Sequence, residues 1–304
     1  FFPQMVQGPI SRFDQLAPQL TAERKLCWDD LQIGIQLALW GYFKKIVIAD
    51  RAAVLVNNVI MENCPYGGAV IALGILFYCI QLYCDFSGGI DMVLGVAQLF
   101  GIEMMPNFRQ PYFSTSLGDF WRRWHITLSG WFRDYIYIPL GGNRKGQARQ
   151  LFNMFLVWAA TGIWHGASWN FIAWVLYFFV LLTIEKTFLL KYLKKGKVWP
   201  HLYTLFFVVL GWGLFTANQP GAPLGLLLQK LFVPQGGISA VYSLRNYGVL
   251  LALGCVCSSA LPRRLWDKIS RNTVVKLLVF TLLLVLCVCY VVAATNATAL
   301  YANF

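Results

Sequence analysis

The chain has 304 residues, of which 58% are hydrophobic, 16% are aromatic and 12% are charged. Soluble globular domains carry about 25% charged residues, so this composition excludes an ordinary soluble domain and indicates a membrane protein. The net charge of +12 at pH 7 would suit nucleic acid, but the basic residues lie mostly in short loops between apolar runs, which is typical of polytopic membrane proteins. The eight cysteines include no CxxC pair, which predicts neither disulfides nor a metal site.

Apolar runs suited to membrane helices occur along the whole chain. Leu31–Ile48 and Ala69–Cys84 are apolar enough to enter the membrane, whereas Ile90–Gly101 is too short to cross alone and is expected either to be re-entrant or to join its neighbour. Five clearer spans follow: Leu151–Trp169, Phe171–Leu190, Leu202–Ala217, Tyr247–Leu261 and Val274–Ala294. We therefore predict an all-α polytopic bundle that forms a single domain, residues 1–304. Because the sequence opens at Phe1 with no signal-peptide pattern, further helices are expected upstream.

Loop charges predict how the later spans are oriented. Basic residues cluster before Leu151, after Leu190 and after Leu261, whereas the turn at Ser168–Asn170 has none. This alternation is what five successive crossings require, and it places the basic loops in the cytoplasm. The turn after His165 and the C-terminus are then expected on the outer side.

The stretch Pro106–Gly146 has a different pattern. Large side chains recur at helical spacing along one face: Trp121, Trp124, His125, Leu128, Phe132 and Tyr135. Arg122, Ser129 and Arg133 share another face. This pattern predicts an amphipathic interfacial helix with arginines at the headgroup level and aromatic side chains turned inward, ended by Pro139 and the following glycines.

Three histidines occur: His125, His165 and His201. His165 lies near the outer end of a predicted span, where an ionisable side chain is costly, so it is a candidate general base that takes a proton from a hydroxyl group. The alternative is a packing histidine or a headgroup anchor beside Trp164 and Trp169. His125 is expected on the inward aromatic face, where a hydrogen-bonded core histidine is the simpler interpretation.

Several charged residues are further candidates. Arg122, Arg123 and Arg133 can bind phosphates, of coenzyme A or of anionic lipids, or can simply anchor the chain at the cytoplasmic face. Asp85 and Asp91 lie within apolar sequence, which predicts either paired or functional carboxylates or helix caps at a break. Motifs of serine hydrolases, P-loop ATPases and zincins do not occur.

Longer motifs resemble a known family. The run from Phe120 to Ser129 (FWRRWHITLS), its continuation from Trp131 to Arg144 (WFRDYIYIPLGGNR) and the segment from Phe2 to Arg12 (FPQMVQGPISR) are similar to the bacterial membrane-bound O-acyltransferase (MBOAT) family, alginate O-acetyltransferase branch. So are Tyr83–Gly88 (YCDFSG), Gly162–Gly166 (GIWHG) and Gly211-Trp212. These motifs span about the first two thirds of the chain, and the resemblance identifies the chain as the C-terminal part of a longer family member.

The resemblance implies a funnel of bundled helices with a thin central partition. It implies that His165 is the essential catalytic histidine and His125 the second. The donor would be acetyl-CoA or another cytoplasmic acyl thioester, with no tightly bound cofactor, and Arg122, Arg123 and Lys145 would neutralise its phosphates. The expected partners are an SGNH/GDSL-type extracytoplasmic O-acetyltransferase, an exported polysaccharide acceptor and membrane lipids, and the expected location is the bacterial plasma (inner) membrane. Thr216 stands where the family has an arginine.

Other functions stay open on sequence alone. A transporter or flippase for a glycan precursor would show broken helices in two matching halves, and these are not found. An acyltransferase with a long-chain donor would carry the same residue types. A non-catalytic scaffold that recruits a secreted transferase is the third alternative.

Overall fold

A computed structural model describes the chain except residues 26, 61–66, 167, 217–223, 233–236 and 294–304. The described residues form helices and no strand, with η marking 3₁₀- and π-helices: η1 (Phe2–Gln4), α1 (Phe13–Thr21), α2 (Trp28–Tyr42), η2 (Phe43–Ala49), α3 (Asp50–Val59), α4 (Gly68–Leu99), η3 (Pro111–Phe113), α5 (Leu117–Arg123), α6 (Ile126–Phe132), η4 (Arg133–Tyr137), α7 (Gln147–Trp164), α8 (Trp169–Ile184), η5 (Glu185–Leu189), α9 (Leu190–Leu193), α10 (Trp199–Thr216), α11 (Leu224–Leu231), α12 (Gly237–Cys257), α13 (Leu261–Ile269) and α14 (Thr273–Ala293). The predicted all-α class is confirmed.

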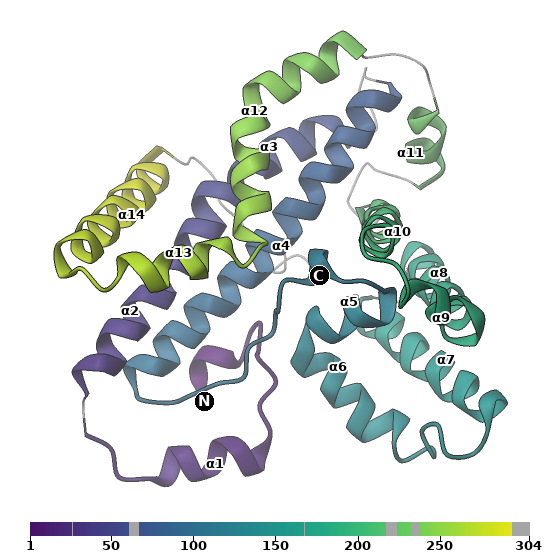
Figure 1. Ribbon diagram of the computed structural model, residues 1–304, viewed down its shortest axis with the longest axis horizontal. Helices are drawn as coiled ribbons and strands as arrows, with labels where there is room; N and C mark the ends of the chain where they lie inside the picture. The colour runs from purple at the N-terminus through teal and green to yellow at the C-terminus, as the bar shows by residue number, and fades with distance from the viewer. Residues whose placement is uncertain (26, 61–66, 167, 217–223, 233–236, 294–304) are drawn as a thin grey trace. The chain divides into compact units, whose positions relative to one another are not determined.

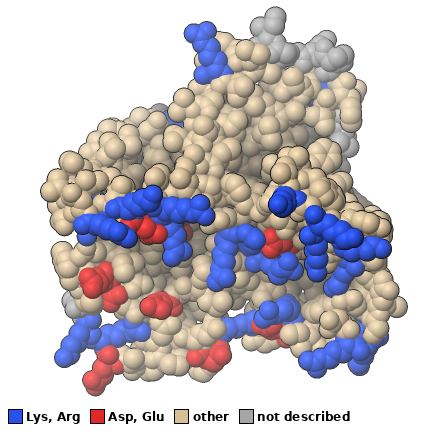
Figure 2. Space-filling model, in the orientation of Figure 1, with Lys and Arg blue, Asp and Glu red and all other residues tan. Residues whose placement is uncertain are grey.

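Five helical segments are long and apolar enough to cross a membrane, within the described ranges: Gly68–Leu99, Trp169–Leu193, Trp199–Thr216, Ser239–Cys257 and Thr273–Ala293. Much of the face drawn in Figure 2 carries no charged side chain, as lipid contact requires. Two predicted spans differ from the structure. α7 ends at Trp164 and is not among the five, and α12 begins ten residues before the expected Tyr247.

The chain divides into two compact units, which are described separately. Unit 1 contains the described residues of Phe1–Ala53 and Ile80–Arg109, and the chain from Val249 to the end of α14. Unit 2 contains the described residues of Val54–Cys79 and Gln110–Gly248.

In unit 1, α2 packs against α4 through glycines. A Cβ atom on Gly41 would lie 2.5 Å from the carbonyl oxygen of Gly88, and one on Gly95 would lie 2.6 Å from the carbonyl oxygen of Gly34. The two backbones are therefore in direct contact, because each glycine pair leaves no room for a side chain. The glycines are seven residues apart in both helices, so both pairs lie along one line of contact.

Helix α4 also corrects the sequence interpretation. It runs without interruption through Ser87, Gly88 and Gly89, so Ile90–Gly101 joins its neighbour and is not re-entrant. At about 1.5 Å per residue its 32 residues extend about 48 Å, well beyond a hydrocarbon core of about 30 Å. The alternative in which Asp85 and Asp91 cap helices at a break is therefore wrong.

Those carboxylates are paired instead. The Lys44 ammonium lies 2.8 Å from an Asp91 oxygen and donates to the Ser87 hydroxyl at 2.8 Å. The adjacent Lys45 bridges Asp50 and, at 3.0 Å, Asp85. Both lysines belong to the π-helical turn η2 that follows α2. The ion pairs thus fasten η2 to the middle of α4 inside unit 1.

In unit 2, α8 packs against both α7 and α10, and these helices lie side by side in Figure 1. Gly162 of α7 would place a Cβ 2.9 Å from the Val175 side chain of α8, and Gly211 of α10 would place one 2.4 Å from the Phe178 ring. Both glycines therefore allow the helix backbones to approach closely. Gly166 lies beyond the end of α7, in a turn with φ +117°, and is not part of a helix contact.

The prediction of one continuous amphipathic helix through Trp121–Tyr135 is wrong. The chain forms α5, breaks at Trp124 and His125, and resumes as α6 and the π-turn η4. The inward face is confirmed for Trp124, Leu128 and Phe132, which are buried, whereas Tyr135 is exposed. The break is the main local feature that positions the candidate site.

Candidate active site around His125 and His165

His125 occupies the break between α5 and α6. Trp124 is extended, with φ −102° and ψ 126°. His125 follows with φ 47° and ψ 55°, in the left-handed region that is uncommon for residues other than glycine. Such a backbone costs about 1–3 kcal/mol and persists only where surrounding packing enforces it. The histidine is therefore held at a defined point and is not one residue of a regular helix face.

His165 caps the C-terminal end of α7. Its backbone N–H donates to the Thr161 carbonyl at 3.2 Å, and its side chain is partly exposed. The imidazole ring lies among three aromatic rings, with centroid distances of 5.6 Å to Phe171, 5.6 Å to Trp174 and 5.4 Å to Phe215. α8 provides the first two rings and α10 provides the third, so the packing of three helices determines where the imidazole lies.

The two histidines are brought together. Burial lowers the pKa of His125 to about 3, and the proximity of His165 lowers it as well. His125 lies outside the five apolar spans. At neutral pH its imidazole is therefore uncharged, so it can accept or donate a hydrogen bond but is not a fixed cation.

A tryptophan cluster connects the surroundings of the two histidines. The Trp212 ring lies 4.8 Å from that of Trp124 and 5.6 Å from that of Phe215, which in turn packs on His165. Trp121 and Trp174 extend the cluster. The indole N–H groups of Trp121, Trp174 and Trp212 are buried and have no hydrogen-bond acceptor among the residues that the structure describes. A buried N–H group without an acceptor costs about 1–3 kcal/mol, so three in one cluster are unusual.

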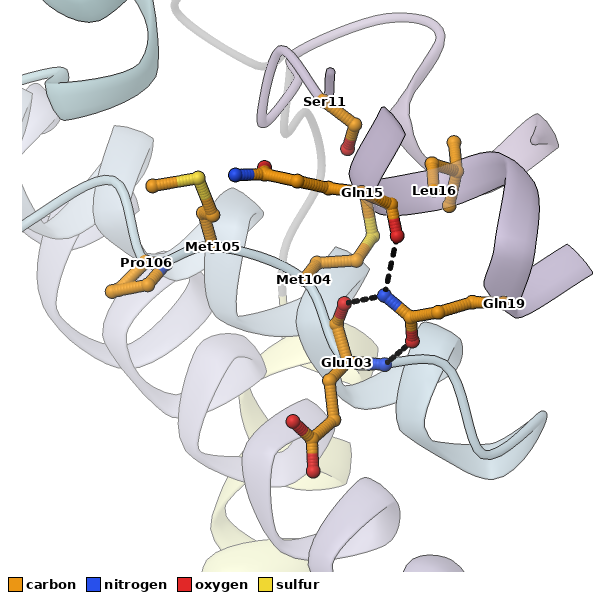
Figure 3. A pocket seen from close by; sticks show the side chains of 8 residues that line it. All are labelled: Ser11, Gln15, Leu16, Gln19, Glu103, Met104, Met105 and Pro106. Atoms are coloured by element: carbon orange, nitrogen blue, oxygen red, sulfur yellow. Dashed lines mark hydrogen bonds between the residues drawn. The ribbon is translucent and has the colours of Figure 1, made fainter. Parts of the chain in front are cut away.

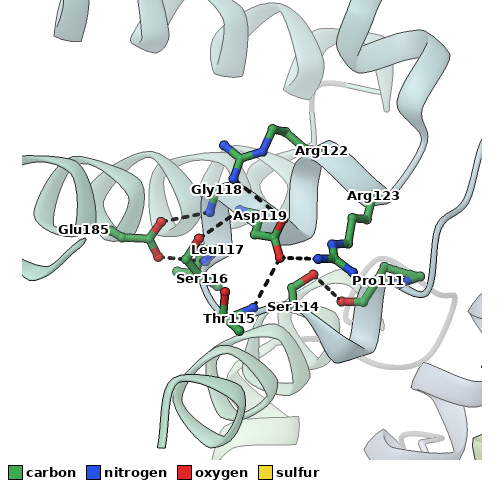
Figure 4. A network of polar contacts seen from close by, with 10 residues as sticks. All are labelled: Pro111, Ser114, Thr115, Ser116, Leu117, Gly118, Asp119, Arg122, Arg123 and Glu185. Atoms are coloured by element: carbon green, nitrogen blue, oxygen red, sulfur yellow. Dashed lines mark hydrogen bonds and ion pairs between the residues drawn. The ribbon is translucent and has the colours of Figure 1, made fainter. Parts of the chain in front are cut away.

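Glu185 anchors the short helix that leads to His125. Figure 4 shows its carboxylate pointing at the beginning of α5, where it accepts hydrogen bonds from the Leu117 N–H at 2.7 Å and the Gly118 N–H at 2.9 Å. The first N–H groups of a helix have no partner within the helix, and a carboxylate there also matches the positive end of the helix dipole. Ser116 adds a second cap by accepting from the Asp119 N–H at 3.0 Å. Glu185 therefore links α8 and η5 to α5.

Sequence reasoning missed Glu185. The signal was present, because Glu185 is the only acidic residue in the predicted span Phe171–Leu190. An acid inside an apolar run must find polar partners. Its partners are backbone N–H groups at positions 117 and 118, and no side-chain pattern points to them.

The predicted phosphate-binding residues lie in two places within unit 2. Arg122 and Arg123 end α5, and both contact the Asp119 carboxylate, at 3.6 and 3.0 Å. Arg122 is mostly exposed, whereas Arg123 is half-buried. Lys145 lies in the turn after η4, with its aliphatic chain over Gly141, and does not belong to the Asp119 network. The structure therefore joins the two arginines but does not join Lys145 to them.

Two further residues have clear positions. Thr216, at the expected arginine position, is fully buried, and its hydroxyl donates to the Gly213 carbonyl of its own helix at 2.8 Å. His201 lies in the first turn of α10 and is half-exposed, which fits the boundary position expected for it.

A separate cavity of about 460 Å³ lies in unit 1, between α1 and the segment after α4. Figure 3 shows Gln19 at one wall, where its side-chain amide donates to the Glu103 carbonyl and accepts from the Glu103 N–H, both at 2.9 Å. Gln15, Met104 and Met105 also line the cavity. None of the predicted site residues lines it.

Comparison with known proteins agrees with the motifs. The model of MBOAT, the membrane-bound O-acyltransferase family, matches residues 1–220. The chain is 41% identical over 221 residues to a probable alginate O-acetylase AlgI of Pseudomonas fluorescens, and the aligned region covers 72% of this chain and 44% of that protein. It is 36% identical over 245 residues to a peptidoglycan O-acetyltransferase of Helicobacter pylori, covering 79% of this chain and 46% of that protein.

A third relative is more distant. The chain is 30% identical over 240 residues to a teichoic acid D-alanyltransferase of Bacillus subtilis, covering 72% of this chain and 60% of that protein. The chain thus spans less than half the length of the first two relatives. Together with the apolar helices, these matches confirm an integral membrane protein and the predicted resemblance: the chain belongs to the membrane-bound O-acyltransferase family.

Proposed function

We propose that this chain is part of an O-acyltransferase that moves an acyl group, an acetyl group in the simplest case, from a cytoplasmic thioester such as acetyl-CoA towards hydroxyl groups outside the cell. The receiving hydroxyl belongs to an exported polysaccharide or to an SGNH/GDSL-type partner, and the membrane is the bacterial plasma membrane. The names of the relatives, alginate O-acetylase and peptidoglycan O-acetyltransferase, support this reaction class. The observation that carries the proposal is the proximity of His125 to His165, whose ring lies against Trp174 and Phe215.

In this proposal His165 is the general base. Its imidazole takes the proton from the acceptor hydroxyl as that oxygen attacks the thioester carbonyl carbon. The tetrahedral intermediate collapses, the carbon–sulfur bond breaks, and the imidazolium returns its proton to the departing thiolate. The buried rings of Phe171, Trp174 and Phe215 against His165 support the proposal because apolar surroundings limit the access of bulk water, which would otherwise hydrolyse the thioester.

The indole N–H groups of Trp174 and Trp212 are proposed as hydrogen-bond donors in this mechanism. During attack the carbonyl oxygen becomes negative, and donors fixed at that point stabilise the charge. Trp174 and Trp212 are buried, lie within the cluster that surrounds His165, and offer N–H groups that have no acceptor in the described part of the chain. We assign them to the acyl carbonyl oxygen. His125, uncharged at neutral pH, then positions the acceptor or relays a proton to His165.

Donor binding is assigned to the cations near the site. Guanidinium groups bind phosphates through paired hydrogen bonds, and Arg122 and Arg123 are ordered by a shared carboxylate at the end of α5. Asp119 offsets part of their charge, so the two arginines orient the phosphates of the donor more than they attract them. Lys145, exposed in its own turn, is proposed as an additional contact for the phosphates.

The test replaces His165 by alanine in the protein as the cell makes it. His165→Ala should abolish O-acetyl incorporation into the envelope polymer while the amount of protein in the membrane stays unchanged. His201→Ala is the matched control, because His201 lies at the start of α10 and outside the aromatic cluster around His165. Full activity of the His165 variant would end the catalytic proposal and would favour a scaffold that recruits a separate transferase.

A further inference from the structure

The helix α13 has a strongly uneven charge distribution. It lies in unit 1 and connects α12 to α14, the last two apolar helices (Figure 1). From Leu261 to Arg271 the chain carries four basic residues, Arg263, Arg264, Lys268 and Arg271, and a single acidic one, Asp267. All four basic side chains are exposed, and the described residues contain no ion pair to any of them. This segment lies outside residues 1–220, which the family model matches.

The opposite side of α13 is apolar. Pro262, Trp266 and Ile269 are half-buried at i, i+4 and i+7 spacing, and the Trp266 ring lies 5.3 Å from Phe280 of α14. Beside this packed stripe, Leu261 and Leu265 are 45% and 48% exposed. The apolar side of α13 is therefore wider than the stripe that packs against the protein, and Leu261 and Leu265 remain exposed beside that stripe.

The position of α13 determines what those surroundings are. α12 ends at Cys257 and α14 begins at Thr273, so α13 lies within four residues of two helices that are able to span the membrane. A helix at that level has acyl chains on one side and lipid headgroups on the other. The exposed leucines match the acyl chains, and the unpaired guanidinium and ammonium groups match negatively charged phosphates.

We propose that α13, together with Arg271, forms a binding surface for the headgroups of anionic phospholipids, with Leu261 and Leu265 inserted among the acyl chains. The surface fixes the loop between α12 and α14 at the membrane boundary. It is independent of the catalytic proposal, because none of the residues assigned to catalysis or to donor binding lies in α13.

The test compares two variants that lose the same charge. The first is the triple variant Arg264→Gln, Lys268→Gln and Arg271→Gln. The matched control is Lys194→Gln, Lys195→Gln and Lys197→Gln, three exposed lysines in the loop between α9 and α10. Each protein is placed in bilayers of phosphatidylcholine with a minor fraction of phosphatidylglycerol. The association of spin-labelled phosphatidylglycerol relative to spin-labelled phosphatidylcholine is then measured by electron paramagnetic resonance.

The unmodified protein should prefer phosphatidylglycerol several-fold, the α13 variant should lose most of this preference, and the lysine control should keep it. An equal loss in both variants would show a general charge effect and would overturn the proposal, as would an unchanged preference in the α13 variant. A second measurement needs no variant. A photoactivatable phosphatidylglycerol should label the peptide containing residues 261–271 more than a photoactivatable phosphatidylcholine does, and equal labelling by both lipids would refute the proposal.

Discussion

Replacing Glu185 by glutamine tests whether the buried carboxylate positions the site. The carboxylate accepts two hydrogen bonds, from the Leu117 and Gly118 N–H groups at 2.7 and 2.9 Å, and Leu117 has no exposed surface. Glutamine has the same shape but only one acceptor oxygen, so one N–H group at the start of α5 loses its partner. The other hydrogen bond becomes a neutral one. Hydrogen bonds to charged groups contribute about 1.5–3 kcal/mol each, so we expect a loss of about 3 kcal/mol in total.

This loss should appear in both stability and rate. The free energy of unfolding should fall by about 3 kcal/mol, measured by chemical denaturation in detergent micelles. α5 leads directly to Trp124 and His125, so its displacement should also lower the acyl-transfer rate by about ten- to a hundredfold, since each 1.36 kcal/mol corresponds to about tenfold in rate. Thr187→Val is the control, because Thr187 is exposed in the same turn and its hydroxyl bonds only to its own helix. Unchanged stability and rate in Glu185→Gln would refute the anchoring role.

Three further perturbations address other parts of the molecule. Lys44→Met should destabilise unit 1 by about 3 kcal/mol in chemical denaturation, because it leaves Asp91 without its cation. Adding Asp91→Leu should restore most of the lost stability, and no recovery in the double variant would contradict the pairing. The lowered pKa of His125 means that the folded state resists protonation, so its contribution to stability is complete above pH 6.5 and is lost as the pH falls from 6.5 towards 3. His125→Asn should therefore flatten the acid side of a thermal-midpoint profile, and an identical profile would disprove this origin. Trp212→Phe should lower kcat by about tenfold or more with KM unchanged, and an unaltered kcat would exclude its N–H as the carbonyl donor.

Sequence patterns predicted the features that depend on composition and local spacing. The apolar runs predicted the helical class. For Asp85 and Asp91 the sequence left open pairing, a functional role or helix capping, and the structure shows that both are paired. Their partners, Lys44 and Lys45, are distant in sequence, and no local signal identifies them. The glycines of α4 resembled a break because glycine lowers helix propensity, yet here they allow α2 to approach the backbone of α4.

The sequence named the two histidines of the candidate site but did not predict their geometry. His125 and His165 were found from the cost of burying an ionisable group and from motif resemblance, and the structure brings them together. The break at Trp124 and His125 was missed because the residues on both sides keep helical spacing, so hydrophobic periodicity continues across it. The left-handed backbone at His125 depends on packing between distant segments. Glu185 was missed for the same reason, since its partners are main-chain groups of another helix.

The left-handed backbone of His125 affects how any substitution there must be interpreted. Alanine would remove the imidazole. Alanine also has a Cβ atom but no polar side chain that could stabilise the backbone at φ 47°, so it disfavours the native backbone by about 1–2 kcal/mol relative to glycine. An alanine scan therefore mixes the loss of a ring with a shift in the path of the chain between α5 and α6. Glycine accepts this backbone, so only the comparison of glycine with alanine separates the chemistry of the side chain from the shape of the bend that presents it.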